Sequence, residues 1–186
     1  MRIIGGEFKS RKILFPKTRQ TRPMTDRAKE TIFNVLGTIC QDAIVLDLFA
    51  GSGSLGLEAL SRGAREVYFV DDAKASQNCI QQNIKSLSLN QSRAQIIGLP
   101  VPQAISRLEK QSKKFDLIFL DPPHNKGLIK KILHRLDASD IVNPSGTIVV
   151  GRSNLESLPK DLKTLYLQRE IKIGQTFVSL LIKGNQ

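Results

Sequence analysis

The sequence holds only two cysteines and no tryptophan, and no apolar run reaches the roughly 18 residues that a membrane-spanning helix needs. Cys40 and Cys79 lie far apart and show no metal-ligand spacing, so we expect two reduced, buried cysteines and no metal site. The first residues lack the apolar stretch of a signal peptide, which predicts a cytoplasmic protein. These absences exclude a membrane protein and a disulfide scaffold.

What is present is a chain of 186 residues, 40% of them hydrophobic, with a net charge of +11. These values are typical of one globular domain with a sizeable core, with or without a small appendage. The positive charge is concentrated at the start, because residues 1–22 contain seven basic side chains and one acidic one. Apolar residues interleave with these cations at 2–6 and 12–16, which predicts two short strands around a turn. Such a cationic ribbon favours a polyphosphate partner, and a solvated arm that only aids solubility is the alternative.

Beyond residue 22 the chain alternates between two hydrophobic periodicities. Nearly continuous apolar runs predict buried parallel strands at 43–49, 67–70, 94–97, 115–120 and 147–150. Helical spacing predicts helices at 26–39, 55–62, 73–89, 101–113 and 126–136. Two further β-rich runs, 164–173 and 176–182, predict an antiparallel hairpin that completes the sheet. This alternation indicates an α/β fold with a doubly wound sheet.

A glycine-rich motif follows the first predicted strand. Gly51, Gly53 and Gly56 fit the G-x-G-x-x-G pattern, which lets backbone approach a nucleotide ligand at the start of a helix. Asp71 lies 20 residues after Gly51, where an acid can bind ribose hydroxyls. Asp47 ends the strand four residues before Gly51, and its negative charge opposes a pyrophosphate but suits an ammonium or sulfonium. S-adenosylmethionine carries both cations and no phosphate, so we favour it as the cofactor.

Two other interpretations of this motif remain open. A nicotinamide-dependent oxidoreductase would use the same glycines and Asp71, although Asp47 argues against it. The glycines could also merely relieve crowding in a turn that Asp47 caps.

The second motif, Asp121-Pro122-Pro123-His124, directly follows the fourth predicted strand. The carboxyl ends of parallel strands meet at one edge of an open sheet, so this tetrapeptide should face the glycine loop. The two prolines remove N–H donors and fix φ, leaving acceptors from the Asp121 side chain and a main-chain carbonyl. Such a paired acceptor would hold an exocyclic NH2 group with its lone pair toward a methyl donor. A simple Asp-Pro turn is the alternative.

Together these motifs resemble the class I S-adenosylmethionine-dependent methyltransferases, and within them the small-subunit rRNA guanine-N2 methyltransferase family, RsmD. The resemblance covers nearly the whole chain and rests on residues 2–6, 22–34, 47–64 and 121–123. It implies a seven-stranded sheet, mostly parallel, with a basic RNA-contacting extension at 1–22 and a methyltransferase domain at 23–186. It further implies an enzyme that methylates a guanine N2 amine of 16S rRNA during assembly of the small ribosomal subunit, and we expect this enzyme to be a monomer.

The resemblance also assigns candidate residues. Those expected to bind S-adenosylmethionine are Asp47, Phe49, Ala50, Gly51, Ser52, Gly53 and Asp71. Those expected to hold the target amine are Asp121, Pro122, Pro123 and His124. Those expected to grip RNA phosphates are Arg2, Lys9, Arg11, Lys12, Arg19 and Arg22. The base must be exposed or flipped out to reach such a site.

Three positions depart from the family's pattern. His124 stands where a stacking aromatic is common. Residues 98–102 (Gly-Leu-Pro-Val-Pro) stand where an acid or amide often follows the third strand, and Gly151-Arg152 stands where an acid tends to follow the fifth. Two further functions therefore stay open beside the guanine enzyme. They are an adenine-N6 nucleic-acid methyltransferase, which would use the same Asp-Pro-Pro geometry, and a non-catalytic RNA-binding assembly factor.

Overall fold

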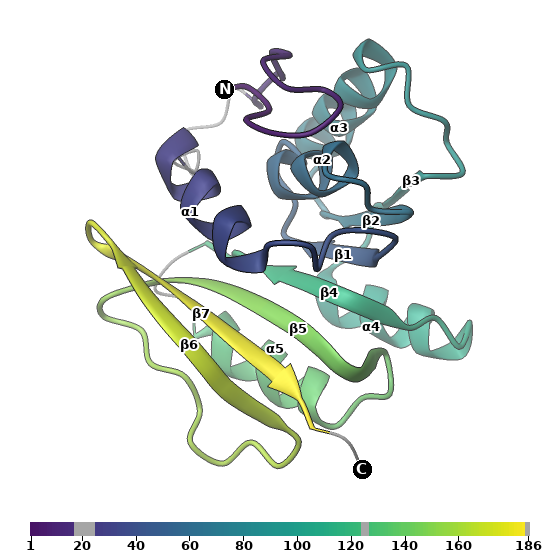
Figure 1. The fold of residues 1–186 in the computed structure, drawn as a ribbon. Coiled ribbons are helices and arrows are strands. Elements are labelled where there is room, and N and C mark those ends of the chain that lie inside the picture. Colours follow the sequence, from purple (N-terminus) through teal and green to yellow (C-terminus); the bar gives the residue numbers. More distant parts are fainter. Residues whose placement is uncertain (17–24, 124–126, 185–186) are drawn as a thin grey trace.

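Seven strands form one sheet in the computed structural model, which describes residues 1–16, 25–123 and 127–184 (Figure 1). The order across the sheet is β3-β2-β1-β4-β5-β7-β6, with parallel pairing from β3 to β5 and antiparallel pairing of β7 with β5 and of β6 with β7. The strands are β1 (Ile44–Leu48), β2 (Glu66–Val70), β3 (Ala94–Ile97), β4 (Phe115–Leu120), β5 (Val142–Ser153), β6 (Leu165–Ile173) and β7 (Thr176–Lys183). The predicted doubly wound sheet with an antiparallel C-terminal hairpin is confirmed.

Helices cover both faces of this sheet (Figure 1). One face carries α1 (Asp26–Leu36), α2 (Ser54–Ser61) and α3 (Lys74–Ser86), and the other carries α4 (Val101–Lys110) and α5 (Leu128–Asp137). Within the part of the chain that the structure describes, none of these helices is long and apolar enough to cross a membrane.

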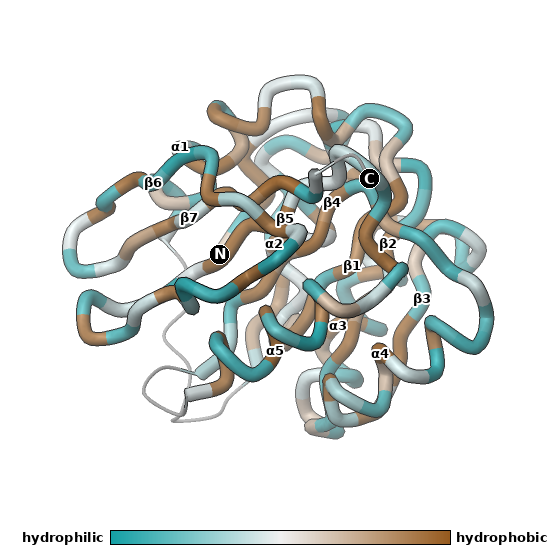
Figure 2. Tube along the Cα trace, turned by 90° about the horizontal axis from the view of Figure 1, so that it is seen from below, coloured by the Kyte–Doolittle hydropathy of each residue, from teal (hydrophilic) through white to brown (hydrophobic). Residues whose placement is uncertain are grey.

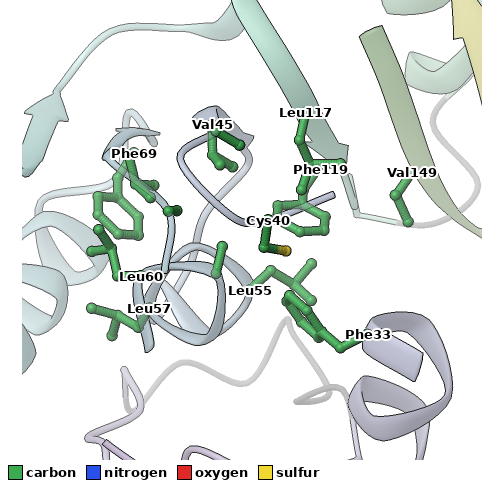
Figure 3. Packing of buried hydrophobic residues seen from close by; sticks show 14 of the residues in the cluster. Phe33, Cys40, Val45, Leu55, Leu57, Leu60, Phe69, Leu117, Phe119 and Val149 are labelled. Atoms are coloured by element: carbon green, nitrogen blue, oxygen red, sulfur yellow. The ribbon is translucent and has the colours of Figure 1, made fainter. Parts of the chain in front are cut away.

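Apolar side chains fill both layers between helices and sheet, and the hydrophobic residues follow the strands through the middle of the fold (Figure 2). On the α1–α3 side, Phe33 of α1 packs against Phe119 of β4 with ring centroids 5.7 Å apart (Figure 3). Cys40 lies in the same cluster, and burial raises the pKa of its thiol to about 11. Both cysteines are free and buried, as predicted.

Two boundaries differ from the predictions for local reasons. Helix α1 ends at Leu36 rather than Ile39, because Gly37 takes a left-handed φ of 55° and its N–H donates to the Phe33 carbonyl at 3.1 Å. Strand β5 begins at Val142, five residues before the predicted strand, although it contains Pro144. Its register against β4 shifts between Phe115 and Leu117, so the pairing is irregular at the start of β5. The turn-like residues in this part of the sequence are why its pattern predicts no strand there.

The predicted N-terminal pair is antiparallel around a turn, but it is much shorter than expected and forms no regular strands. The segment 1–13 folds back on itself through one isolated antiparallel bridge, Arg2 with Lys12, and the rest is turn and bend. Its apolar residues Ile3 and Ile13 are buried in the core beside α1 and α2. We call residues 1–16 the N-terminal segment. It is docked on the domain rather than extended as a free arm.

The sheet reverses its winding between β1 and β4. From β1 the chain proceeds outward to β2 and β3, then returns to place β4 on the other side of β1. The carboxyl ends of β1, β2 and β4 therefore lie together at a topological switch point, where open α/β sheets bind ligands.

Candidate active site

The glycine loop leaves β1 in a run of left-handed backbone. Phe49, Gly51 and Gly53 have φ values of 60°, 56° and 76°, and Gly53 stands immediately before α2. A bulky residue such as Phe49 rarely adopts this conformation, so the surrounding structure must hold it there. Gly56 fits the third glycine of the motif, because a Cβ there would lie 2.4 Å from the Phe69 ring of β2. The loop is therefore tight, and α2 packs closely against the sheet at Gly56.

Asp71, at the end of β2, fixes the loop from the other side. Its Oδ2 accepts the Gly51 N–H at 2.8 Å and its Oδ1 accepts the Ala73 N–H at 3.0 Å. The Gln77 amide donates to the Asp71 main-chain carbonyl at 3.0 Å. Each carboxylate oxygen has a second lone pair, so Asp71 can still accept two hydroxyl groups of a ribose.

Asp47 is buried within the switch point. It is 2% exposed, and its Oδ2 accepts the Gly56 N–H at 2.9 Å. Burial is the main cause that raises the pKa of this carboxyl to about 7; the hydrogen bond from Gly56 opposes the rise, and the negative charges of Asp121 and Asp71 add to it. The three carboxylates thus share one electrostatic environment, which favours a cationic ligand.

Asp121 follows β4 and packs against β5. A Cβ added to Gly151 would lie 2.4 Å from Asp121 Oδ1, which is closer than real side-chain carbons approach. Gly151 therefore gives the carboxylate the space it occupies. Pro122 is buried and Pro123 is half-buried, while His124 lies outside the described residues.

A mostly apolar pocket of about 300 Å³ opens between the ends of β2, β3 and β4. Its floor includes Phe49 of the glycine loop and Pro123 of the second motif, with Asp71 and Asp72 at the β2 side. Pro100 and Val101 supply the wall where the family pattern has a polar residue after the third strand. The preceding Gly98 allows Gln77 to approach, because a Cβ there would lie 2.8 Å from its amide. An apolar pocket of this kind accommodates a flat heteroaromatic ring.

The predicted cofactor residues are thereby brought together at one edge of the sheet. The two motifs, 74 residues apart between Asp47 and Asp121, meet across the β1–β4 pair, in which Leu48 lies opposite Leu120. Among the described residues no group of three His, Cys, Asp or Glu side chains could hold a metal ion.

The predicted RNA-binding residues occupy the N-terminal segment. Arg2, Lys9, Arg11 and Lys12 are all exposed. Two of them also contact the domain: Arg2 Nε pairs with Asp26 Oδ2 at 3.2 Å, and Arg11 donates to the Ser86 carbonyl at 2.7 Å. Arg19 and Arg22 lie outside the described residues.

Sequence reasoning missed the residues that hold this segment in place. Glu58 of α2 is fully buried, and its two carboxylate oxygens accept the Ile4 and Gly5 N–H groups, each at 2.8 Å. Lys29 of α1 is also fully buried, donates to the Arg2 carbonyl and lies 3.8 Å from Glu58. The available signal was Lys29, which lies beside Ile32 and Phe33 on the apolar face of a predicted helix. A charged residue on such a face indicates a buried partner.

Comparison with known proteins agrees with this geometry. The family model described as "Conserved hypothetical protein 95" matches residues 1–182. The Bacillus subtilis protein YlbH is 38% identical over 98% of this chain and 99% of its own length. Ribosomal RNA small subunit methyltransferase D of Escherichia coli is 36% identical over 94% of this chain and 86% of its own length.

A solved structure gives the same result. The Escherichia coli protein yhhF superimposes with a TM-score of 0.86 at 33% sequence identity, covering 100% of this chain and 99% of that one. The chain therefore belongs to the conserved hypothetical protein 95 family, which is the RsmD methyltransferase family that its motifs resemble.

Proposed function

We propose that this protein transfers the methyl group of S-adenosylmethionine to the exocyclic N2 amine of a guanine in 16S rRNA, as a cytoplasmic monomer acting during assembly of the small subunit. Family membership supports the reaction class, since one relative is named a small-subunit rRNA methyltransferase. The observation that carries the proposal is the placement of Asp121-Pro122-Pro123 beside Asp47 and Asp71 at the switch point.

The described residues fit S-adenosylmethionine by the chemistry of their groups. Asp47 offers a buried carboxylate to the ammonium of the methionine part, and the left-handed backbone around Gly51 leaves room for that part to lie along the loop. Asp71 has lone pairs for the two ribose hydroxyls. The pocket between Phe49 and Pro123 suits the adenine ring.

The chain's own residues then orient the target amine. The Asp121 carboxylate and a neighbouring main-chain carbonyl accept its two N–H groups, which turns the nitrogen lone pair out of conjugation with the ring. When bound, S-adenosylmethionine would supply a methyl carbon on a cationic sulfur, which as the leaving group would take the C–S bonding pair. The nitrogen forms the new N–C bond, and its surplus proton leaves past Asp121 to solvent. Orientation of this kind can lower a barrier by about 7–11 kcal/mol, so no strong base is needed.

Gly151 accounts for one departure from the family pattern. An acid at this position would place its side chain in the space of the Asp121 carboxylate. With glycine there, Asp121 is the acceptor on this side of the site.

The experiment is methyl transfer with product identification. The protein is incubated with labelled S-adenosylmethionine and unmodified small-subunit rRNA, both free and assembled into particles, and the RNA is digested to nucleosides. Label in N2-methylguanosine supports the proposal. Label in N6-methyladenosine would identify an adenine enzyme, and RNA binding without label would identify an assembly factor; either result contradicts the proposal.

A further inference from the structure

One buried amide, that of Asn83 on α3, contacts both the N-terminal segment and the glycine loop. Its Oδ1 accepts the Leu14 N–H at 2.7 Å, and its Nδ2 donates to the Leu14 carbonyl at 3.1 Å. The same Nδ2 donates to the carbonyl of Ser52 at 3.0 Å. Asn83 is fully buried, so water does not compete for these bonds.

The Asn83 amide holds the backbone of the segment rather than its side chains. Leu14 receives both a donor and an acceptor, as it would from a neighbouring strand, while its own side chain is 52% exposed. Apolar burial therefore contributes little at this residue, and its position depends on the Asn83 amide. The RNA-facing cation Arg11 is tied to the same helix through the Ser86 carbonyl.

On the other side, the Asn83 amide fixes one peptide of the glycine loop. Ser52 lies between Gly51 and Gly53, which both have left-handed φ. Glycines leave such a loop many alternative conformations, so a buried donor on the Ser52 carbonyl selects one of them. A displacement of Leu14 and a displacement of Ser52 thus act on the same side chain.

We infer that Asn83 is a positioning residue that couples RNA contact by the N-terminal segment to cofactor binding at the 49–53 loop. The inference rests on the proposed function, because it requires that the segment binds RNA. RNA that holds the segment in its docked position also holds Asn83 and Ser52 in place, which favours the loop conformation that receives the cofactor. Coupling of this kind is reciprocal, so the cofactor also tightens RNA binding.

The test is the affinity for S-adenosylhomocysteine, which cannot react, measured with and without saturating small-subunit rRNA. For the unaltered protein we expect rRNA to tighten the affinity about fivefold or more. In Asn83→Ala both ligands still bind, but the ratio of the two affinities falls to about one. Asn78→Ala, at an exposed position of the same helix, keeps the full ratio. A purely structural role for Asn83 would lower stability and leave the ratio unchanged.

Two results would overturn the coupling: a ratio of one in the unaltered protein, or a full ratio in Asn83→Ala. If the alanine variant does not fold, Asn83→Asp takes its place, since it keeps an acceptor for Leu14 and loses both donors. The double variant Lys9→Gln/Lys12→Gln separates this from the proposed function. If the RNA affinity of this double variant is unchanged, the segment does not bind RNA and the proposed role of the segment fails. If its RNA affinity falls, but rRNA does not change the S-adenosylhomocysteine affinity of the unaltered protein, only the coupling fails.

Discussion

In the proposed function, recognition of the cofactor's charge depends on Asp47. A carboxyl buried to this degree, with a pKa of about 7 and two acidic neighbours, destabilises the ligand-free protein when it is ionised. For an acid whose pKa is raised on folding, the stability penalty is absent below the ordinary pKa of 3.8, grows as pH rises from there to the folded pKa of about 7, and is constant above it. A cationic ligand removes that penalty by pairing with the ionised form.

The first prediction concerns this titration. Affinity for S-adenosylhomocysteine should rise with pH up to the pKa of about 7 and then level off, changing about tenfold per pH unit below it, because Asp47 must lose its proton to pair with the ammonium. Titration calorimetry in buffers of different ionisation enthalpy should detect the released proton. Asn in place of Asp47 should weaken binding and flatten the profile; a profile that survives in Asp47→Asn would show that another group titrates.

The second prediction concerns Gly151. In Gly151→Ala the new Cβ would collide with Asp121 Oδ1, so the carboxylate must move. We expect methyl transfer to fall about 100-fold, as displacement of a reacting group by about 1 Å can do, with the S-adenosylhomocysteine affinity unchanged. Gly174→Ala, at the tip of the β6–β7 hairpin, adds a Cβ that meets nothing within 4 Å. Its φ of 63° makes alanine cost some stability, but Asp121 is not displaced, so the folded protein should keep its activity. Full activity in Gly151→Ala would show that Asp121 tolerates the shift.

The element that most distinguishes this chain from a bare methyltransferase sheet is the N-terminal segment. It has almost no regular structure of its own, and buried polar groups of α1, α2 and α3 hold its backbone. Glu58 is the centre of this arrangement, because it also pairs with Arg62, whose guanidinium lies over the Phe33 ring at 4.9 Å. The segment is thereby fixed to the same helix that begins at the glycine loop.

The third prediction is that Glu58→Gln destabilises the protein strongly. The substitution removes the buried counter-charge of the Lys29 ammonium, leaving only the more exposed Asp26 at 3.9 Å. It also turns an NH2 group toward a backbone N–H of the segment. The loss of one partner of a buried ion pair typically costs about 3–5 kcal/mol. Urea unfolding should show this loss, while Glu30→Gln, at an exposed position of α1, should change the free energy of unfolding by less than about 0.5 kcal/mol. Equal stabilities would mean that Glu58 is not a main anchor.

Elements with a continuous pattern could be predicted from sequence, and those held by distant contacts could not. Strands β1 and β4 are buried on both faces, so their apolar runs gave the correct type and nearly the correct bounds. Lys29 is buried only because the Arg2 carbonyl and Glu58 approach it from other parts of the chain. Likewise, the need for Gly151 follows from the position of Asp121, 30 residues away, which no local pattern contains.

At the scale of the whole molecule, the fold places the docked segment and the cofactor loop on connected elements. The segment packs with α1, α2 and α3 on one face of the sheet, and the loop leads directly into α2 (Figure 1). The positive charge of the chain is concentrated in and just after this segment. In the proposed function, RNA bound there would lie on the part of the molecule that also shapes the cofactor site, and the target base would have to be exposed or flipped out to enter that site.

The most direct test of this account is the separation of transfer from cofactor binding in Asp121→Ala. Transfer of labelled methyl to small-subunit rRNA and the affinity for S-adenosylhomocysteine are measured on the same preparation, with Asp140→Ala, an exposed acid just before β5, as the matched control. If Asp121 orients the target amine, transfer falls about 100-fold or more, while the affinity, measured above the Asp47 pKa of about 7, changes little. An equal fall in both, or full transfer without the Asp121 carboxylate, would contradict it.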